Sequence, residues 1–316
     1  MNVDYGCFYR RPIHVERISD ELPVFDVFVS AFNNSDRVNN VFGSVRAGKK
    51  IWLVHPEYQY APVEQPTGAV IVAPSARDEI AQVSALLLEM GELAGKNICI
   101  DVTGFMRHVL TFLVVKLAVG GLKQFTALYS EPLYYVRQEQ TNFSTITSGV
   151  VRPIQGMRGV NSSQGKDYLL VGVGFDHKLI GEVAHYKDNS IVYPLFAFPS
   201  LSPDMYQQSA TRAYQSGDVA LSPEWISNRR FAPANDPFST AGIIRDVIRE
   251  IDRLDGSANI YMAPLSTKVQ VLGFSLYWWL EGRHRGRVSV LLPECVRYSR
   301  ETSVGLKRLW SFTIET

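Results

Sequence analysis

The sequence is poor in cysteine and in long apolar runs. Its three cysteines, Cys7, Cys99 and Cys295, match no zinc-binding spacing, so we expect them to be reduced thiols. Their small, odd number argues against a secreted protein held by disulfides. The longest apolar stretch, residues 109–120, contains Lys116 and is too short to span a bilayer, and no apolar N-terminal targeting segment is visible. These absences predict a cytoplasmic protein without a membrane segment.

An excess of charge of one sign is also absent. The 32 lysines and arginines nearly balance the 31 acidic residues, which gives a net charge of +1. This balance argues against a dominant nucleic-acid-binding surface, although it allows a local basic patch. The six histidines are scattered without a helical metal-binding pair, so no metal site is predicted.

What the sequence does contain is a regular alternation of strand-like and helix-like segments. The strand-like segments are apolar and rich in β-branched residues, and they cover residues 24–31, 49–55, 69–73, 98–102, 125–129, 167–174, 191–198, 260–263, 287–292 and 309–314. Strands that alternate with helices are typical of βαβ units. The alternation predicts an α/β protein with two Rossmann-like halves, each with a mostly parallel sheet and flanking helices.

The division between the halves is predicted from composition. Residues 137–166 are polar and rich in glycine and serine. We therefore expect a first Rossmann-like half over residues 1–140, a linker over 141–166 and a second half over 167–316. Whether the halves form two sheets or one is left open by the sequence.

Three local features set further expectations. Residues 1–22 are mixed and predict an irregular lead-in or a short edge hairpin, and Ser75 is a candidate cap for the helix that follows it. Pro194 inside a predicted strand places that strand at a sheet edge. The last strand, Leu309–Ile314, is expected to be antiparallel and at an edge.

The first candidate site is the turn after the strand at residues 98–102. Asp101, Thr103 and Gly104 lie between this strand and a long apolar helix, and Arg107 follows one turn later. A helix N-terminus presents unpaired N–H groups and a partial positive charge, which suit a phosphate or a ribose. The alternative is an ordinary capped helix with a solvated arginine.

The second candidate site has the same layout. Ser266, Thr267 and Lys268 follow a short apolar strand and open an apolar helix. Two hydroxyls and a lysine at a helix start resemble the end of a phosphate-binding loop, but the glycine-rich run of such a loop is missing, which argues against an NTPase of that type. A capped helix with a solvated lysine is the alternative here too.

A third candidate follows the strand at residues 167–174. Gly172 and Gly174 make a G-x-G pair, and His177 stands where the dinucleotide-binding fingerprint requires a third glycine. An NAD site is therefore not predicted. Gly174 and His177 remain candidate ligand-binding residues, and His177 could act as an acid or a base, although a lone histidine is more often a surface residue.

The two strand–turn–helix layouts resemble the CARF and SAVED nucleotide-sensing domains of prokaryotic antiviral systems. Those domains are Rossmann-like and bind cyclic oligonucleotides at their strand ends. The resemblance implies ligand-binding roles for Thr103, Gly104, Arg107, Ser266, Thr267 and Lys268. No attached nuclease, protease or membrane effector is visible, so the resemblance implies a sensing or scaffolding chain with its effector elsewhere.

A second resemblance is local. Phe25–Ser30 looks like the opening strand of a TIR domain, a fold that can cleave NAD or bind partners. The next strand, Lys50–His55, lacks the expected acidic end, and no catalytic glutamate is identified.

Three functions follow as hypotheses. The leading one is a protein that binds a nucleotide or another phosphorylated small molecule, with a sensor or regulatory role in prokaryotic antiviral defence. The second is a nucleotide- or nucleoside-processing enzyme that uses Asp101, Asp176 or His177 as acid or base. The third is an assembly subunit with a protein partner or a second copy of itself. The sequence identifies no catalytic residue with certainty and no cofactor.

Overall fold

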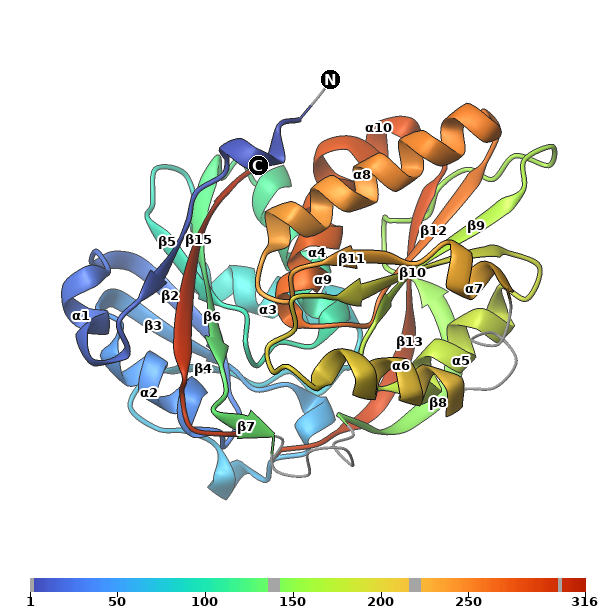
Figure 1. Cartoon of the computed structure of the whole chain (residues 1–316). Coiled ribbons are helices and arrows are strands. Elements are labelled where there is room, and N and C mark those ends of the chain that lie inside the picture. The colour runs from blue at the N-terminus through green and yellow to red at the C-terminus, as the bar shows by residue number, and fades with distance from the viewer. Residues whose placement is uncertain (1–2, 136–142, 216–222, 301–302) are drawn as a thin grey trace. The chain divides into compact units, whose positions relative to one another are not determined.

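The structure, a computed structural model, describes residues 3–135, 143–215, 223–300 and 303–316. It contains two separate large sheets of seven and six strands, whose central strands run parallel and carry helices on their faces (Figure 1). The predicted α/β class with two Rossmann-like halves is confirmed. The open question of one sheet or two is answered by two sheets.

The chain divides into two compact units. The unit that we call the first-sheet unit comprises Phe8–Ile146 and Cys295–Thr316, and the second-sheet unit comprises Met1–Cys7 and Thr147–Glu294. The last residues of the chain thus group with the first half, although they follow the second half in sequence. The domain boundaries that we expect at residues 140 and 166 stay a prediction.

Seven strands form the first sheet: β1 (Arg10–Ile13), β2 (Phe25–Ala31), β3 (Ala47–Leu53), β4 (Val70–Val72), β5 (Ile98–Asp101), β6 (Gln124–Glu131) and β15 (Arg308–Glu315). Their order is β1-β15-β6-β5-β2-β3-β4. From β6 to β4 the neighbouring strands are parallel. The chain starts this parallel part at β2, moves outward through β3 and β4, and then returns to β5 on the other side of β2. The reversal lies between β2 and β5, and α/β sheets bind ligands at the carboxyl ends of two such strands.

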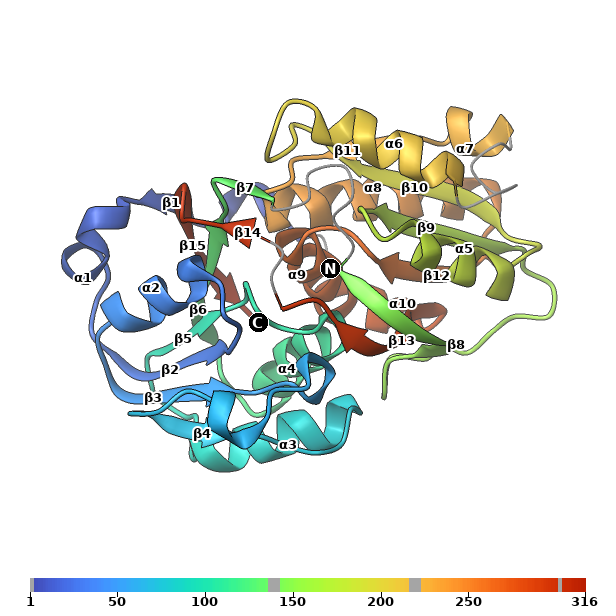
Figure 2. The ribbon, with the colours of Figure 1, turned by 90° about the horizontal axis from the view of Figure 1, so that it is seen from below.

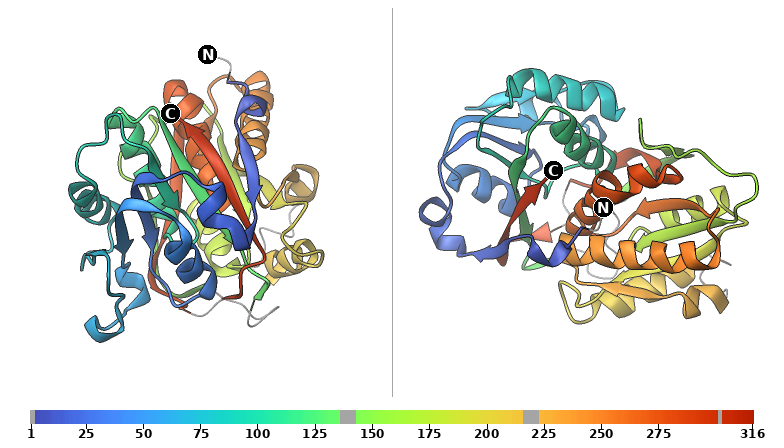
Figure 3. Two further views of the ribbon diagram at one scale, coloured as in Figure 1. Left: turned by 90° about the vertical axis from the view of Figure 1, so that its left-hand side faces the viewer. Right: turned by 90° about the horizontal axis from the view of Figure 1, so that it is seen from above.

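The antiparallel end of the first sheet differs in part from the expectation. β15 is antiparallel as expected, but it lies between β1 and β6 rather than at the edge (Figure 3, left). The edge strand is β1, which forms within the segment expected to be an irregular lead-in or a hairpin. Its partner lies about 300 residues away in sequence, so no local pattern reveals the pairing.

Four helices accompany the first sheet: α1 (Ile18–Glu21), α2 (Asp36–Ser44), α3 (Glu79–Met90) and α4 (Arg107–Val119). α3 begins later than the sequence suggests, because Asp78 rather than Ser75 caps it, accepting a hydrogen bond from the Ala81 N–H at 2.8 Å. A short antiparallel pair, β7 (Tyr134–Tyr135) and β14 (Ser303–Val304), belongs to the same unit (Figure 2).

Six strands form the second sheet: β8 (Ser144–Pro153), β9 (Asp167–Val173), β10 (Ile191–Ala197), β11 (Arg230–Ala232), β12 (Asn259–Pro264) and β13 (Val288–Tyr298). Their order is β11-β10-β9-β12-β13-β8, and the pairs from β11 to β13 are parallel. The parallel part again starts in the middle, at β9, and reverses to β12 on its other side. The second reversal therefore lies at the carboxyl ends of β9 and β12.

The helices of the second sheet cover both of its faces: α5 (His177–Tyr186), α6 (Met205–Gln215), α7 (Pro223–Ser227), α8 (Pro237–Leu254), α9 (Lys268–Tyr277) and α10 (Arg283–Arg285), with a π-helical turn at Trp278–Gly282. α5 and α6 contact each other on one side, and α8 contacts α9 on the other (Figure 1). α8 and α9 approach closely, since a Cβ on Gly273 would lie 2.6 Å from Thr240 Cβ.

One sequence expectation for this unit is corrected. β10 is not an edge strand, because the short strand β11 pairs with Leu195, Phe196 and Ala197. Pro194 lies just before this ladder, so its missing N–H removes no hydrogen bond to β11. All of β8, which joins the sheet beside β13, lies within residues 141–166, the segment that we expect to be the linker.

The core is built from the central parallel strands. In β9 the six residues from Tyr168 to Val173 are all buried, and in β12 every residue is buried. Parallel strands covered on both faces are expected to show such continuous apolar runs. No helix among the described residues combines the length and hydrophobicity needed to cross a membrane.

Candidate functional site

The nine predicted ligand-binding residues fall into two sets, one in each compact unit. Each set lies at the point where the strand order of its sheet reverses. In the first-sheet unit, Asp101 ends β5, and Thr103, Gly104 and Arg107 follow it. The second-sheet unit holds the other set, at the ends of β9 and β12: Gly174, His177, Ser266, Thr267 and Lys268.

At the reversal point of the first sheet, the polar side chains bind one another. Asp101 is completely buried and accepts hydrogen bonds from the hydroxyls of Ser30 at 3.0 Å and Thr103 at 2.5 Å. Thr103 Oγ1 also accepts from the Ser130 N–H at 3.0 Å. Burial raises the pKa of Asp101, and the bonds from Thr103 and Ser30 act in the opposite direction. These side chains join β2, β5 and β6 to one another.

The rest of this turn is also packed by the protein. A Cβ on Gly104 would overlap the backbone oxygen of Ala31, so glycine allows the turn to contact the end of β2. Tyr58 Oη donates to the Gly104 oxygen at 3.1 Å. Arg107 is the first residue of α4 and is half-buried. That these residues bind a ligand stays a prediction.

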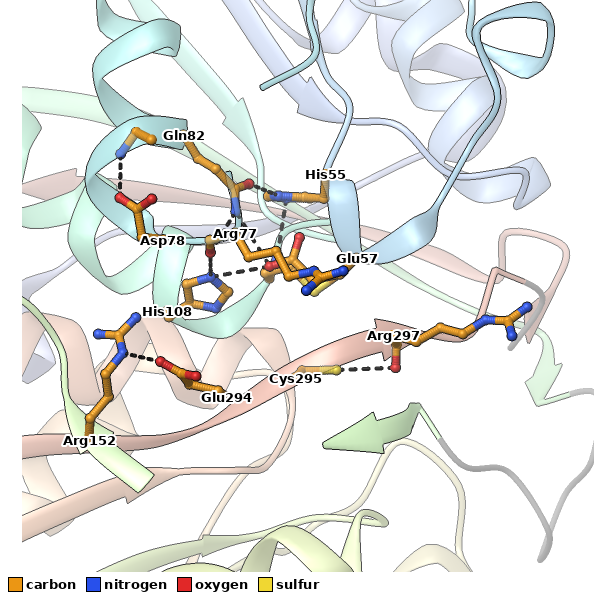
Figure 4. Close-up of polar contacts among 12 residues, drawn as sticks. His55, Glu57, Arg77, Asp78, Gln82, His108, Arg152, Glu294, Cys295 and Arg297 are labelled. Atoms are coloured by element: carbon orange, nitrogen blue, oxygen red, sulfur yellow. Dashed lines mark hydrogen bonds and ion pairs between the residues drawn. The ribbon is translucent and has the colours of Figure 1, made fainter. Parts of the chain in front are cut away.

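A buried polar network that the sequence analysis missed lies nearby in the same unit (Figure 4). His55 is completely buried; its Nδ1 lies 2.6 Å from Gln82 Oε1, and its Nε2 accepts from the Met106 N–H at 3.1 Å. Because Nε2 is an acceptor, Nδ1 carries the proton and the imidazole is neutral. His55 therefore holds the start of α4 against α3.

Glu57 is the charged member of this network and is also completely buried. Gln82 Nε2 and His108 Nε2 each lie 3.4 Å from its Oε1 (Figure 4). Its other oxygen, Oε2, has no hydrogen-bond partner among the residues that the structure describes. Burial acts to raise the pKa of Glu57, but the hydrogen bond with His108 and the attraction of that histidine leave the pKa below its ordinary value.

At the reversal point of the second sheet, glycines bring β9 against the turn after β12. A Cβ on Gly172 would lie 2.8 Å from Ser266 Oγ, and a Cβ on Gly174 would overlap the backbone oxygen of Leu265. The G-x-G pair thus has a packing role that a sequence motif alone could not reveal. Gly174 itself is partly exposed.

The turn after β12 holds one hydroxyl that forms hydrogen bonds within the described chain and one that forms none. Thr267 caps α9, since its Oγ1 accepts from the Gln270 N–H at 3.2 Å and donates to the Ala234 oxygen at 2.8 Å. Ser266 is only 5% exposed, and within the described part of the chain its Oγ has no hydrogen-bond partner. A buried hydroxyl without a partner costs about 1–3 kcal/mol, so its presence needs a reason.

Cationic groups gather where β9 ends and α5 begins. Arg212, from α6, is buried; its Nη1 donates to the Phe175 oxygen at 3.1 Å, and its guanidinium lies 4.7 Å from the Phe175 ring centre. The partly exposed His177 opens α5, and its Nδ1 has no partner in the described ranges. Burial, and then the charges of Arg212 and Lys178, lower the pKa of His177, while Asp176 acts to raise it.

The second reversal point thus combines features that suit an anion. Two helices, α5 and α9, begin there, and Lys268 is the first residue of α9. A helix N-terminus with nearby cations stabilises a negatively charged group. Among the described residues no group of three or more histidine, cysteine, aspartate or glutamate side chains is placed to hold a metal ion.

Comparison with known proteins adds little to this geometry. No family model matches the sequence, and no curated protein matches it. Among solved structures, the chain is weakly similar to the crystal structure of an N-terminal ketoreductase from a macrolactin assembly line, at 11% sequence identity and a TM-score of 0.22. The match covers 89% of this chain and 72% of that chain. A likeness this weak carries no weight for fold or function.

Proposed function

We propose that this protein binds a nucleotide or another phosphorylated small molecule at the carboxyl edge of its second sheet, between β9 and β12. The observation that carries the proposal is Ser266 Oγ, a buried hydroxyl without a hydrogen-bond partner in the described chain, located where α9 begins. Its unfulfilled hydrogen bond is explained if a ligand oxygen completes it. Partly exposed neighbours, among them Gly174, His177 and Thr267, lie around it.

The charges at this edge favour a phosphate over a neutral ligand. Arg212 and Lys178 act together on His177, and Lys268 adds a third cationic side chain at the start of α9. Charge-assisted hydrogen bonds from such groups are about twice as strong as neutral ones. The first turns of α5 and α9 supply backbone N–H groups with the same preference.

The proposed biological role is that of a sensor or regulator in prokaryotic antiviral defence. This part of the proposal depends on the resemblance of the two strand–turn–helix layouts to CARF and SAVED domains. Binding without turnover favours the sensor. Turnover of a bound nucleotide, with His177 and Asp176 as acid and base, would favour the processing enzyme, and a stable hetero-complex without any small-molecule effect would favour the assembly subunit.

A thermal-shift screen of the full chain tests the proposal. The probes are inorganic phosphate, pyrophosphate, nucleoside mono- and diphosphates, NAD and cyclic di- and oligonucleotides. A probe at ~100 times its dissociation constant should stabilise the protein by about 2.7 kcal/mol. Failure of every probe to shift the unfolding temperature contradicts the proposal.

The variant Ser266→Ala makes the screen specific to this site. The variant removes a hydroxyl without a partner, so its ligand-free stability should equal or exceed that of the parent protein, while the ligand-induced shift should shrink or vanish. Ser275→Ala is the matched control, because Ser275 is buried in α9 and its hydroxyl donates to the Val271 oxygen at 2.8 Å. The control should keep the full ligand-induced shift. A full ligand-induced shift in Ser266→Ala would show that the ligand binds at another site.

A further inference from the structure

Three aromatic rings cluster at the carboxyl ends of β10 and β11. Phe198 follows the end of β10, Phe231 lies in β11, and Tyr206 lies in α6. The ring centres of Phe198 and Tyr206 are 5.8 Å apart, those of Phe198 and Phe231 are 6.1 Å apart, and those of Tyr206 and Phe231 are 5.8 Å apart. These distances are typical of interacting aromatic rings, and we call the three residues the aromatic triad.

The triad is exposed on one side and supported on the other. Phe198 is 53% exposed and Phe231 is 42% exposed. The buried ring of Phe196 contacts both Tyr206 and Phe231, at centre distances of 5.4 Å and 6.2 Å. The Tyr206 hydroxyl also accepts a hydrogen bond from Arg229 at 3.2 Å. The rings are thus held by the core while two of them keep surface open to solvent, as a stacking platform requires.

One helix connects this platform to the cationic end of β9. α6 carries Tyr206 near its start and Arg212 six residues later, which places the two about 9 Å apart along the helix axis. The sheet register gives the same connection, because Phe196 pairs with Val173. Phe198 lies two residues after Phe196, and Phe175 lies two residues after Val173. Both residues therefore come just after the carboxyl ends of neighbouring strands.

We infer that the phosphorylated ligand of this edge carries a nucleobase, and that the base stacks on the aromatic triad while the phosphate lies at the ends of β9 and β12. The inference rests on the proposed function and makes it more specific, since a base-free phosphate would leave the triad unused. Every nucleobase has a flat face, so the platform selects for a nucleotide without selecting one base. Arg212 and Tyr206 of α6 then serve the two ends of one ligand.

Isothermal titration calorimetry on the full chain tests the inference. Nucleoside diphosphates and cyclic dinucleotides are compared with pyrophosphate, which has phosphates but no base. The nucleotides should bind at least about fivefold more tightly than pyrophosphate, as expected when a stacked base adds to the affinity.

Two variants separate the base from the phosphate. Phe198→Leu keeps an apolar side chain but removes the ring, so it should weaken nucleotide binding at least about fivefold and leave pyrophosphate binding unchanged. Tyr186→Leu is the matched control, because Tyr186 is an exposed aromatic residue at the opposite end of α5. It should leave both affinities unchanged.

Two failures are distinguishable. Equal affinities for nucleotides and pyrophosphate, both lost in Ser266→Ala and both kept in Phe198→Leu, would overturn the stacked base and leave the phosphate site intact. Binding of none of these probes would overturn both proposals. Association of the protein with itself or another chain that Phe198→Leu abolishes, without any effect on nucleotide affinity, would make the triad a protein-docking surface and also overturn the inference.

Discussion

The hydroxyl of Ser266 lies against Gly172, so closely that a Cβ on this glycine would be 2.8 Å from the oxygen. The two residues belong to β9 and to the turn after β12, the strands at which the second sheet reverses its order. Glycine at position 172 thus leaves room for a polar group that has no partner in the described chain. The pair joins the packing of the sheet to the candidate site.

This relationship predicts a measurable coupling. Gly172→Ala should destabilise the protein by about 1–3 kcal/mol, because the added methyl group overlaps the Ser266 oxygen and crowds the ring of Phe274. In the background of Ser266→Ala the same substitution should cost less, since the oxygen is gone. Urea unfolding of the four proteins measures the coupling. As a control, Gly43→Ala in α2 meets nothing within 4 Å and should stabilise by up to about 1 kcal/mol. Additive effects at 172 and 266 would contradict the prediction.

Gly104→Ala should have a larger effect in the first-sheet unit. The new methyl group would overlap the backbone oxygen of Ala31, which cannot rotate away as a serine side chain can. We expect a loss of about 3 kcal/mol or more, near the upper end for single substitutions. Chemical unfolding followed by circular dichroism measures it. A loss below 1 kcal/mol would show that the turn moves freely relative to β2.

The buried carboxylate of Glu57 predicts a specific pH dependence. Because its pKa is below that of an unfolded glutamate, about 4.3, its contribution to stability is present above that value and is lost as the pH falls through the folded pKa. Glu57→Gln should therefore show a smaller loss of stability on acidification than the parent protein. Asp101, whose pKa is raised, is common to both proteins, so the difference between the two isolates Glu57. Unfolding curves from pH 7 to pH 3 measure it, and identical slopes would contradict the prediction.

Removing one buried ring from the C-terminal strand should strongly lower the stability of the protein. Phe312 in β15 is completely buried and lies opposite Arg10 of β1 and Ala127 of β6. Phe312→Ala should cost about 3–5 kcal/mol, as expected for a cavity at a buried phenylalanine. Glu315→Ala, at an exposed position of the same strand, should change stability by less than about 0.5 kcal/mol. Hydrogen exchange at β1 and β6 reports the loss locally, and unchanged protection there in Phe312→Ala would argue against the pairing.

Much of the fold could be predicted from the sequence, because local patterns carry it. Buried parallel strands such as β9 give continuous apolar runs, and the residues that open helices give polar breaks between them. Strand order could not be predicted in this way, since it depends on contacts between distant segments. Pro194 shows the difference: proline suggests an edge strand, yet a short neighbour lets β10 accommodate it in the interior.

The candidate sites show the same limit. The sequence indicated the two turns that lie at the reversal points, because small polar residues follow their strands. It could not tell that Asp101 and Thr103 bind each other while Ser266 has no partner in the described chain. The network of His55, Glu57, Gln82 and His108 was missed since its members come from three segments up to 53 residues apart. The only local signal is a histidine and a glutamate within four residues of the end of β3.

The position of β15 has a consequence for how the chain is made. Residues 308–315 leave the ribosome only after the whole of the second sheet has been synthesised. Until then β6 lacks its antiparallel neighbour and presents an open edge, while the later-encoded second sheet already has all of its strands. N-terminal segments usually fold first during translation, but here the second sheet is complete before the first. A chain that ends near residue 300, once released from the ribosome, should therefore hold a protease-resistant second sheet and an unprotected first one.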